Sequence, residues 1–114
     1  MLFRSYRSLN TSNPAAFSPS IVQGELRDKM GFDGAIITDD LDANGVTDLT
    51  SPQQAAVNSL KAGNDLILFA QSGGSATGAL RTVVKSIKGG KLSQATVQSA
   101  YDKVIELKDQ LPAK

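Results

Sequence analysis

The sequence of 114 residues contains no cysteine, no histidine and no tryptophan. Without cysteine there is no disulfide framework, no thiolate nucleophile and no zinc–thiolate centre. Without histidine, Ser-His-Asp and Cys-His catalysis, imidazole metal ligands and the usual proton shuttle near neutral pH are excluded. Acid–base chemistry within this sequence therefore rests on carboxylates, lysine or tyrosine, and no cofactor is predicted.

Charge and hydropathy exclude two further classes of partner. The 12 Lys and Arg residues nearly balance the 11 Asp and Glu residues, so the electrostatic footprint of a nucleic-acid-binding protein is missing. No segment approaches the ~20 apolar residues that cross a bilayer, and residues 1–7 lack the apolar core of a signal peptide. We therefore expect no nucleic-acid partner and no membrane segment, and both a cytoplasmic and an exported location stay open.

Apolar spacing predicts helices that alternate with short buried strands. Each of the four expected helices has a residue beside it that is typical of a helix start or stop. The helices are residues 19–30 after Ser18, 52–62 before Gly63, 75–88 before Gly89, and 94–111 after Ser93. Two apolar runs without polar alternation, residues 35–38 and 66–69, are typical of strands buried on both faces. A polar loop follows the first strand and runs to Ser51.

This order of elements predicts an α/β fold class, because helices that alternate with doubly buried strands form crossovers over a parallel sheet. Only two strands are evident, or three if residues 1–6 contribute one. A two-stranded parallel sheet leaves apolar edges without partners. We therefore expect either association through those edges or a piece of a larger sheet, in which this chain alone does not cover both Ile36 and Ile37.

Two adjacent carboxylates, Asp39 and Asp40, directly follow the first predicted strand. Reactive groups of parallel α/β proteins gather at the carboxyl ends of the strands, so these two residues are the candidate catalytic and binding residues. Alternation along a strand directs their side chains to opposite faces. Capping of the following loop or helix is the common alternative role of Asp at a strand end.

Two other loops match ligand-binding patterns in part. A calcium loop of the EF-hand type is matched by Asp40, Asp42, Asn44, Gly45, Val46 and Asp48. Its last position needs a glutamate but holds Ser51, and a strand precedes the loop where a helix is required, so a solvated turn is the alternative interpretation. The Gly73-Gly74 pair lies between a strand and a helix, yet its spacing matches no phosphate-binding motif, which favours a plain connecting loop.

Five short segments occur in a fixed order along the chain. They are Asn13-Pro14-Ala15-Ala16-Phe17-Ser18-Pro19, Leu26-Arg27, Gly31-Phe32-Asp33-Gly34, Thr38-Asp39-Asp40-Leu41 and Ala62-Gly63-Asn64-Asp65. This series closely resembles the last third of the catalytic domain of glycoside hydrolase family 3. The resemblance runs from about Tyr6 to Leu111, which is nearly the whole chain.

The resemblance implies a (β/α)₈ barrel, or a close variant, and the activity of a retaining exo-glycosidase. The family's nucleophile is the Asp that follows the Ser or Thr ending the seventh strand, and this position corresponds here to Asp39. The β-N-acetylhexosaminidase branch usually has Asp next, so Asp40 implies N-acetylglucosaminide substrates, such as muropeptides or chitin fragments. Asp40 is accordingly the candidate substrate-binding residue.

The same resemblance implies that part of the catalytic domain is missing from the sequence. In the hexosaminidase branch, a His on the loop after the fifth strand acts as acid/base, and a Lys-His segment binds the sugar. This sequence has no His. A complete barrel takes at least ~200–250 residues. We therefore expect residues 1–114 to be a C-terminal fragment of the barrel, its last two to three βα units, inactive alone. A non-catalytic α/β module that completes its sheet by self- or partner-association is the alternative hypothesis.

Overall fold

The computed structural model describes Tyr6, Ser8 and residues 13–71 and 73–113. Its elements are η1 (Ala15–Phe17), η2 (Ser20–Lys29), β1 (Ile37–Asp40), α1 (Asn44–Thr47), α2 (Pro52–Ala62), β2 (Leu66–Leu68), α3 (Gly73–Lys88) and α4 (Gln94–Asp109). A third strand over residues 1–6, the further possibility in the sequence, lies outside the described residues except for Tyr6, which is in neither helix nor strand.

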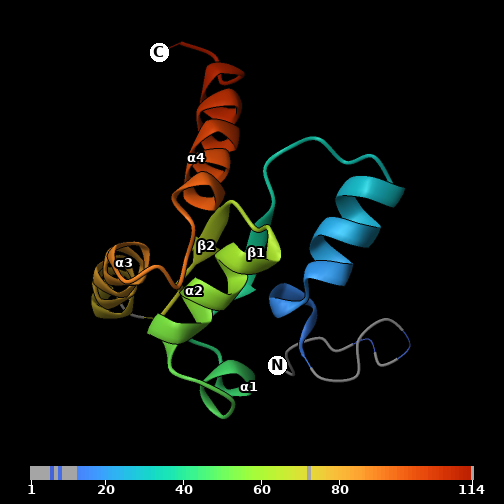
Figure 1. Cartoon of the computed structure of the whole chain (residues 1–114). Coiled ribbons are helices and arrows are strands. Elements are labelled where there is room, and N and C mark those ends of the chain that lie inside the picture. Colours follow the sequence, from blue (N-terminus) through green and yellow to red (C-terminus); the bar gives the residue numbers. More distant parts are fainter. Residues whose placement is uncertain (1–5, 7, 9–12, 72, 114) are drawn as a thin grey trace.

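The two strands form a parallel sheet, and α2 makes the crossover between them. In Figure 1 the strands lie at the centre, η2 lies to one side of them, and α4 extends away toward the C-terminus. The α/β class and the predicted order of the main elements are confirmed. None of the described helices is long and apolar enough to cross a membrane.

The predicted start and stop of the central helix and the predicted start of the last helix are confirmed, whereas the last helix ends at Asp109 and not at residue 111. The Gln54 N–H donates to Ser51 Oγ at 3.2 Å at the start of α2, and Gly63 ends this helix with a φ of 108°. At the start of α4, the Thr96 N–H donates to Ser93 Oγ at 3.1 Å. These signals are local, because a hydroxyl cap satisfies a free helix amide and glycine adopts the left-handed conformation without a Cβ clash.

Three boundaries differ from the sequence-based expectation. The first strand is Ile37–Asp40 and not 35–38, so both candidate carboxylates belong to the strand itself. The expected polar loop contains the short helix α1, whose amides after residue 45 bond back to carbonyls three or four residues earlier. The third long helix already begins at Gly73, so the glycine pair belongs to its first turn and not to a connecting loop.

The first long helix, η2, is a π-helix and not the expected α-helix. Its wider winding is visible where the Met30 N–H donates to the Glu25 oxygen five residues earlier, at 2.9 Å. Single turns of this kind are the common form, and longer runs are rare. The helix still directs one face, with Val22 and Leu26, against Ile36, the residue just before β1.

A buried ion pair joins the end of η2 to the start of both strands. Arg27 donates through Nη2 to Asp65 Oδ2, and the two side chains are 14% and 5% exposed. The same carboxylate oxygen accepts the Ile36 N–H at 2.8 Å, and Arg27 Nη1 donates to the Gly34 carbonyl at 2.9 Å. We call these contacts the Arg27–Asp65 clamp.

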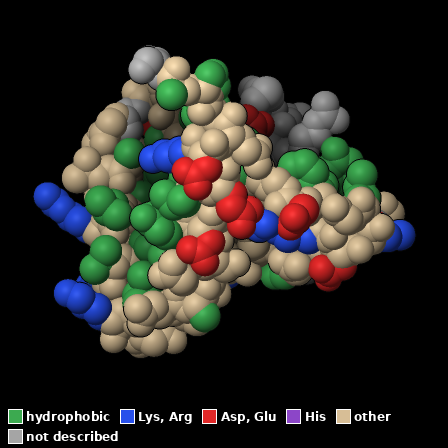
Figure 2. All heavy atoms as spheres, turned by 90° about the horizontal axis from the view of Figure 1, so that it is seen from above, with side chains coloured by type: hydrophobic (Ala, Val, Ile, Leu, Met, Phe, Trp, Pro, Cys, Tyr) green, Lys and Arg blue, Asp and Glu red, His purple; other side chains and the backbone are tan. Residues whose placement is uncertain are grey.

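The apolar interior consists of three small clusters, and α2 contributes to each of them. Its residues in these clusters are Ala55, Leu60 and Ala62. The expectation that one isoleucine lacks a cover is confirmed, because Ile36 is 8% and Ile37 is 58% exposed. Figure 2 shows hydrophobic side chains gathered in one region of a face, with Asp and Glu side chains in a row beside it.

Replacement of Asp65 by Asn tests the clamp. The change keeps an acceptor oxygen for the Ile36 amide but removes the charge that faces Arg27, so we expect Asp65→Asn to lower the free energy of unfolding by about 1.5–3 kcal/mol. Urea unfolding followed by circular dichroism measures this loss.

The matched control is Glu25→Gln, which removes a charge from the exposed pair with Lys29. Exposed pairs contribute little, so this variant is expected to change the free energy by less than about 0.5 kcal/mol. Equal losses in the two variants would contradict a special role for the clamp.

Candidate active site

Asp39 lies at the carboxyl end of β1 with its side chain exposed to solvent. The Asp40 N–H donates to Asp39 Oδ1 at 2.8 Å. The residue also lines a cavity of about 240 Å³ between η1, η2 and β1, whose other walls are mainly apolar. An exposed carboxylate on the rim of a cavity is thus located where the sequence predicted the reactive group.

Asp40 has a different environment, because its carboxylate is bonded to the loop after β2. Asp40 Oδ1 accepts the N–H groups of Ala70 and Asp42, both at 3.0 Å, and Oδ2 is 3.5 Å from Gln71 Nε2. The pKa of Asp40 is held below its ordinary value of 3.8, mainly by the hydrogen bond from the Ala70 amide; burial opposes this effect, and smaller contributions from the Asp42 amide and Gln71 add to it. Asp40 therefore joins the two loops at the carboxyl edge of the sheet.

The calcium-loop interpretation finds no support in the geometry. Within the described residues no three Asp, Glu, His or Cys side chains converge on a point where a metal ion could lie. Residues 44–47, in the middle of the proposed loop, instead form α1, and the Asp42 side chain is buried. Gln71 Nε2 donates to the Asp42 carbonyl at 3.3 Å, so this backbone acceptor is engaged within the protein.

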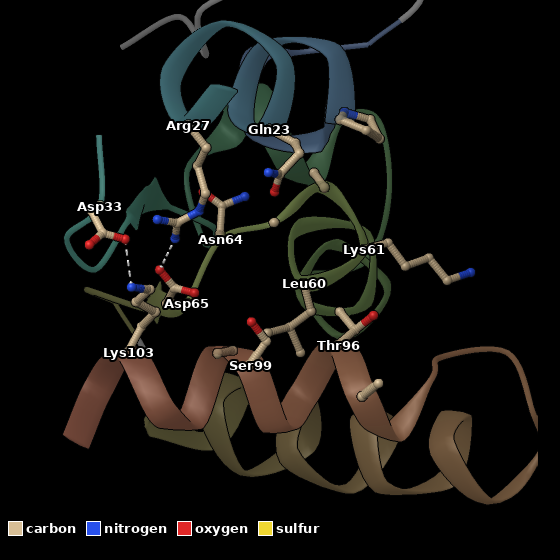
Figure 3. A pocket seen from close by; sticks show the side chains of 15 residues that line it. Gln23, Arg27, Asp33, Leu60, Lys61, Asn64, Asp65, Thr96, Ser99 and Lys103 are labelled. Atoms are coloured by element: carbon tan, nitrogen blue, oxygen red, sulfur yellow. Dashed lines mark hydrogen bonds and ion pairs between the residues drawn. The ribbon is translucent and has the colours of Figure 1, made fainter. Parts of the chain in front are cut away.

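A larger cavity of about 510 Å³ lies at the other end of the strands, between η2, the end of α2 and α4. Figure 3 shows Arg27 and Lys103 entering it from opposite sides. Each of these cations is bonded to a carboxylate on the wall, Arg27 to Asp65 and Lys103 to Asp33 at 2.9 Å. Because Arg27 and Lys103 are paired within the protein, this cavity is a weaker candidate site than the edge with Asp39.

Sequence reasoning located Asp39 and Asp40 but missed three residues that shape their surroundings. Thr38 Oγ1 accepts the Leu68 N–H at 3.1 Å, and Gln71, in the loop after β2, donates toward the Asp40 carboxylate and the Asp42 carbonyl. The buried Asn64 donates through Nδ2 to the carbonyls of Ala16 and Ser59, at 2.8 and 2.9 Å. Thr38 and Asn64 stand in two of the five ordered segments, which was the available signal.

The protein is thus an α/β chain with two parallel strands, and two carboxylates, Asp39 and Asp40, lie at the carboxyl end of β1. Residues 2–107 match the family described as "Glycosyl hydrolase family 3 N terminal domain". The chain belongs to this family.

Individual relatives agree with this membership. The chain is 32% identical over 111 residues to an uncharacterized secreted glycosyl hydrolase of Arthroderma benhamiae, covering 95% of this chain and 31% of that protein. It is 44% identical over 55 residues to a beta-hexosaminidase of Thioalkalivibrio sulfidiphilus, covering 48% of this chain and 16% of the relative. The chain therefore spans less than a third of the length of these curated relatives.

A solved structure shows the same fold at comparable identity. The beta-N-acetylhexosaminidase of Beutenbergia cavernae superimposes with a TM-score of 0.88 at 30% identity. The match covers 95% of this chain and 32% of that enzyme. The α/β arrangement of this chain is therefore similar to that of about a third of this beta-N-acetylhexosaminidase.

The bonds of Asp40 predict a pH-dependent contribution to stability. Because the folded-state pKa lies below the unfolded one, the ionised Asp40 stabilises the fold above pH 3.8, and this contribution is lost as the pH falls through the lowered pKa. The melting temperature of Asp40→Asn is expected to lie below that of the parent chain at pH 7, with the gap closing toward pH 2. Thermal melts followed by circular dichroism at a series of pH values measure it.

Asp109→Asn is the control, since Asp109 is an exposed carboxylate at the end of α4. Its melting temperature is expected to follow that of the parent chain at every pH. A gap for Asp40→Asn that stays constant from pH 7 to pH 2 would contradict a role for the charge.

Proposed function

We propose that this chain supplies the nucleophile of a retaining glycoside hydrolase that acts on terminal β-linked N-acetylglucosaminides. The observation that carries the proposal is the location of Asp39, an exposed carboxylate at the carboxyl end of β1 on the rim of a cavity. The substrate class is supported by the names of the relatives, which include beta-hexosaminidases and a beta-N-acetylhexosaminidase. A muropeptide-like fragment belongs to the same substrate class.

The proposed chemistry proceeds through a covalent intermediate. A carboxylate oxygen of Asp39 attacks the anomeric carbon, the bond from that carbon to the leaving oxygen breaks, and water later hydrolyses the glycosyl-enzyme. A second group, about 5–5.5 Å from the nucleophile, must protonate the leaving oxygen. Because the sequence has no histidine, the acid/base of the hexosaminidase branch has no counterpart among these residues.

We further propose that residues 1–114 form the C-terminal part of a (β/α)₈ barrel, its last two to three βα units. The exposed apolar side chains of Ile37 on β1 and Leu68 on β2 support this, since neighbouring strands of a barrel would cover them. The chain's match to about a third of the Beutenbergia cavernae enzyme supports it as well. With a nucleophile but no acid/base, the chain alone is expected to turn over p-nitrophenyl N-acetylglucosaminide slowly or not at all.

Asp40 stays the candidate for a contact to the sugar. Two backbone amides share its Oδ1, whereas Oδ2 faces only the longer contact of 3.5 Å to Gln71 Nε2 among the described bonds. Oδ2 is therefore the oxygen to which a sugar hydroxyl would donate.

A second candidate function is a non-catalytic module that associates through the open edges of its sheet. The exposure of Ile37 and Leu68 favours it, because apolar strand edges pair with other strands. Sedimentation equilibrium distinguishes the two functions. A stable monomer with a cooperative melt counts against the module, whereas a concentration-dependent dimer supports it.

Covalent trapping tests the nucleophile without the missing acid. We expect an N-acetylglucosaminyl fluoride whose ring carries a second fluorine to label Asp39, because fluoride leaves without protonation and the ring fluorine slows hydrolysis of the product. One Asp39 oxygen bonds to the anomeric carbon as the carbon–fluorine bond breaks. Peptide mass spectrometry detects the added sugar.

Two variants control the trapping experiment. Asp39→Asn is expected to abolish the label, and Asp48→Asn, at an exposed carboxylate just after α1, is expected to retain it. A sugar found on another carboxylate would contradict the nucleophile assignment. Rapid, Asp39-dependent turnover by the chain alone would contradict the partial-barrel proposal.

A further inference from the structure

The strand that carries Asp39 contains one residue more than its partner over the same length. Ile37 is paired with Leu66 and Asp40 with Leu68, so three residue steps in β1 match two in β2. The extra residue falls at Thr38–Asp39. A bulge of this kind redirects a side chain and is rare between parallel strands.

Two side chains take the place of backbone acceptors at this bulge. In a regular parallel ladder, strand amides donate to carbonyls of the neighbouring strand. Here the Leu68 N–H donates to Thr38 Oγ1 at 3.1 Å, and the Ala70 N–H donates to Asp40 Oδ1 at 3.0 Å. The residues on both sides of Asp39 are therefore attached to β2 and its following loop through their side chains.

The side chain of Asp39 remains directed to solvent between these two attachments. Thr38 is buried, and the Asp40 amide, whose own side chain is held by Ala70, donates to Asp39 Oδ1 at 2.8 Å. A shift of one residue along a strand exchanges the faces to which its side chains point. The bulge thus determines which face of the sheet Asp39 presents.

We propose that Thr38 and Asp40 are positioning residues for Asp39. Their side chains stabilise the bulge in β1, and the Asp40 amide then fixes the orientation of the Asp39 carboxylate. This inference rests on the proposed role of Asp39 as nucleophile, and it assigns to Asp40 a role that is independent of any contact with the sugar.

Nuclear magnetic resonance of the ¹⁵N-labelled chain tests the Thr38 attachment. Thr38→Val keeps the shape of the buried side chain and removes the acceptor, so the Leu68 amide is expected to exchange about five- to tenfold faster. The amide proton of Asp40 is expected to shift toward its position in Asp39→Ala, where its acceptor is absent. Thr38→Ser restores the hydroxyl and is expected to restore both signals.

The Asp40 attachment is tested in the same way with a second pair of variants. Asp40→Ala is expected to speed exchange of the Ala70 amide by a similar factor, and Asp40→Asn, which retains an acceptor oxygen, to preserve most of its protection. Thr47→Val is the control, because Thr47 is exposed on α1 and its hydroxyl donates to the Asn44 carbonyl. If Thr38→Val does not fold, the Asp40 pair decides the proposal.

The outcomes separate this inference from the proposed function. Unchanged Leu68 and Ala70 exchange in folded variants, or faster exchange without movement of the Asp40 amide proton, overturns the positioning role. Slower sugar labelling of Asp39 in Thr38→Val, with recovery in Thr38→Ser, supports it, and equal labelling rates overturn it. Absence of any label on Asp39 in the parent chain overturns the proposed function, while the amide signals still report the bulge.

Discussion

The carboxylate of Asp65 is the constraint on which the arrangement of the sheet depends. It precedes β2, it is almost completely buried, and it accepts both the Ile36 N–H before β1 and the guanidinium of Arg27 at the end of η2. A buried charge is tolerated when it is paired and hydrogen-bonded, and the loss of either partner is expensive in free energy. The same guanidinium donates to the Gly34 carbonyl, so the segment just before β1 is held in place. This contact helps to determine where β1 begins and therefore where Asp39 lies.

The two ends of the sheet differ in how their charges are satisfied. At the amino end, Arg27 pairs with Asp65 and Lys103 with Asp33, and the carboxyl of Asp33 has a pKa held below its ordinary value mainly by its bond to Lys103. At the carboxyl end, Asp39 Oδ1 accepts the backbone N–H of Asp40, and the Asp39 side chain stays exposed. The buried Arg27–Asp65 pair stabilises the fold, whereas the exposed carboxylate of Asp39 is accessible to a ligand, so the two ends of the sheet differ in how their carboxylates are used.

The sequence was sufficient for features set by neighbouring residues and insufficient for those set across the chain. The caps Ser51 and Ser93 were predictable because each bonds to an amide three residues away. Asp39 was predictable because parallel strands gather reactive groups at their carboxyl ends. The sequence did not predict the bounds of the first strand, its bulge or the bond from Asp40 to the loop after β2. These features depend on Thr38 and Asp40, whose side chains accept hydrogen bonds from amides 30 residues further along the chain. Such contacts leave no periodic pattern in the sequence.

The bonds around Asp39 nevertheless lie within a short part of the chain, from the Arg27–Asp65 clamp to the loop after β2. None of these bonds involves the exposed apolar side chains of Ile37 or Leu80. The three small apolar clusters and the bulge depend on different contacts, because the bulge is held by hydrogen bonds between β1 and the segment formed by β2 and its following loop. Under the proposed function, the bonds that orient Asp39 do not involve the group that protonates the leaving oxygen, so formation of the glycosyl-enzyme and complete turnover test two different parts of that proposal.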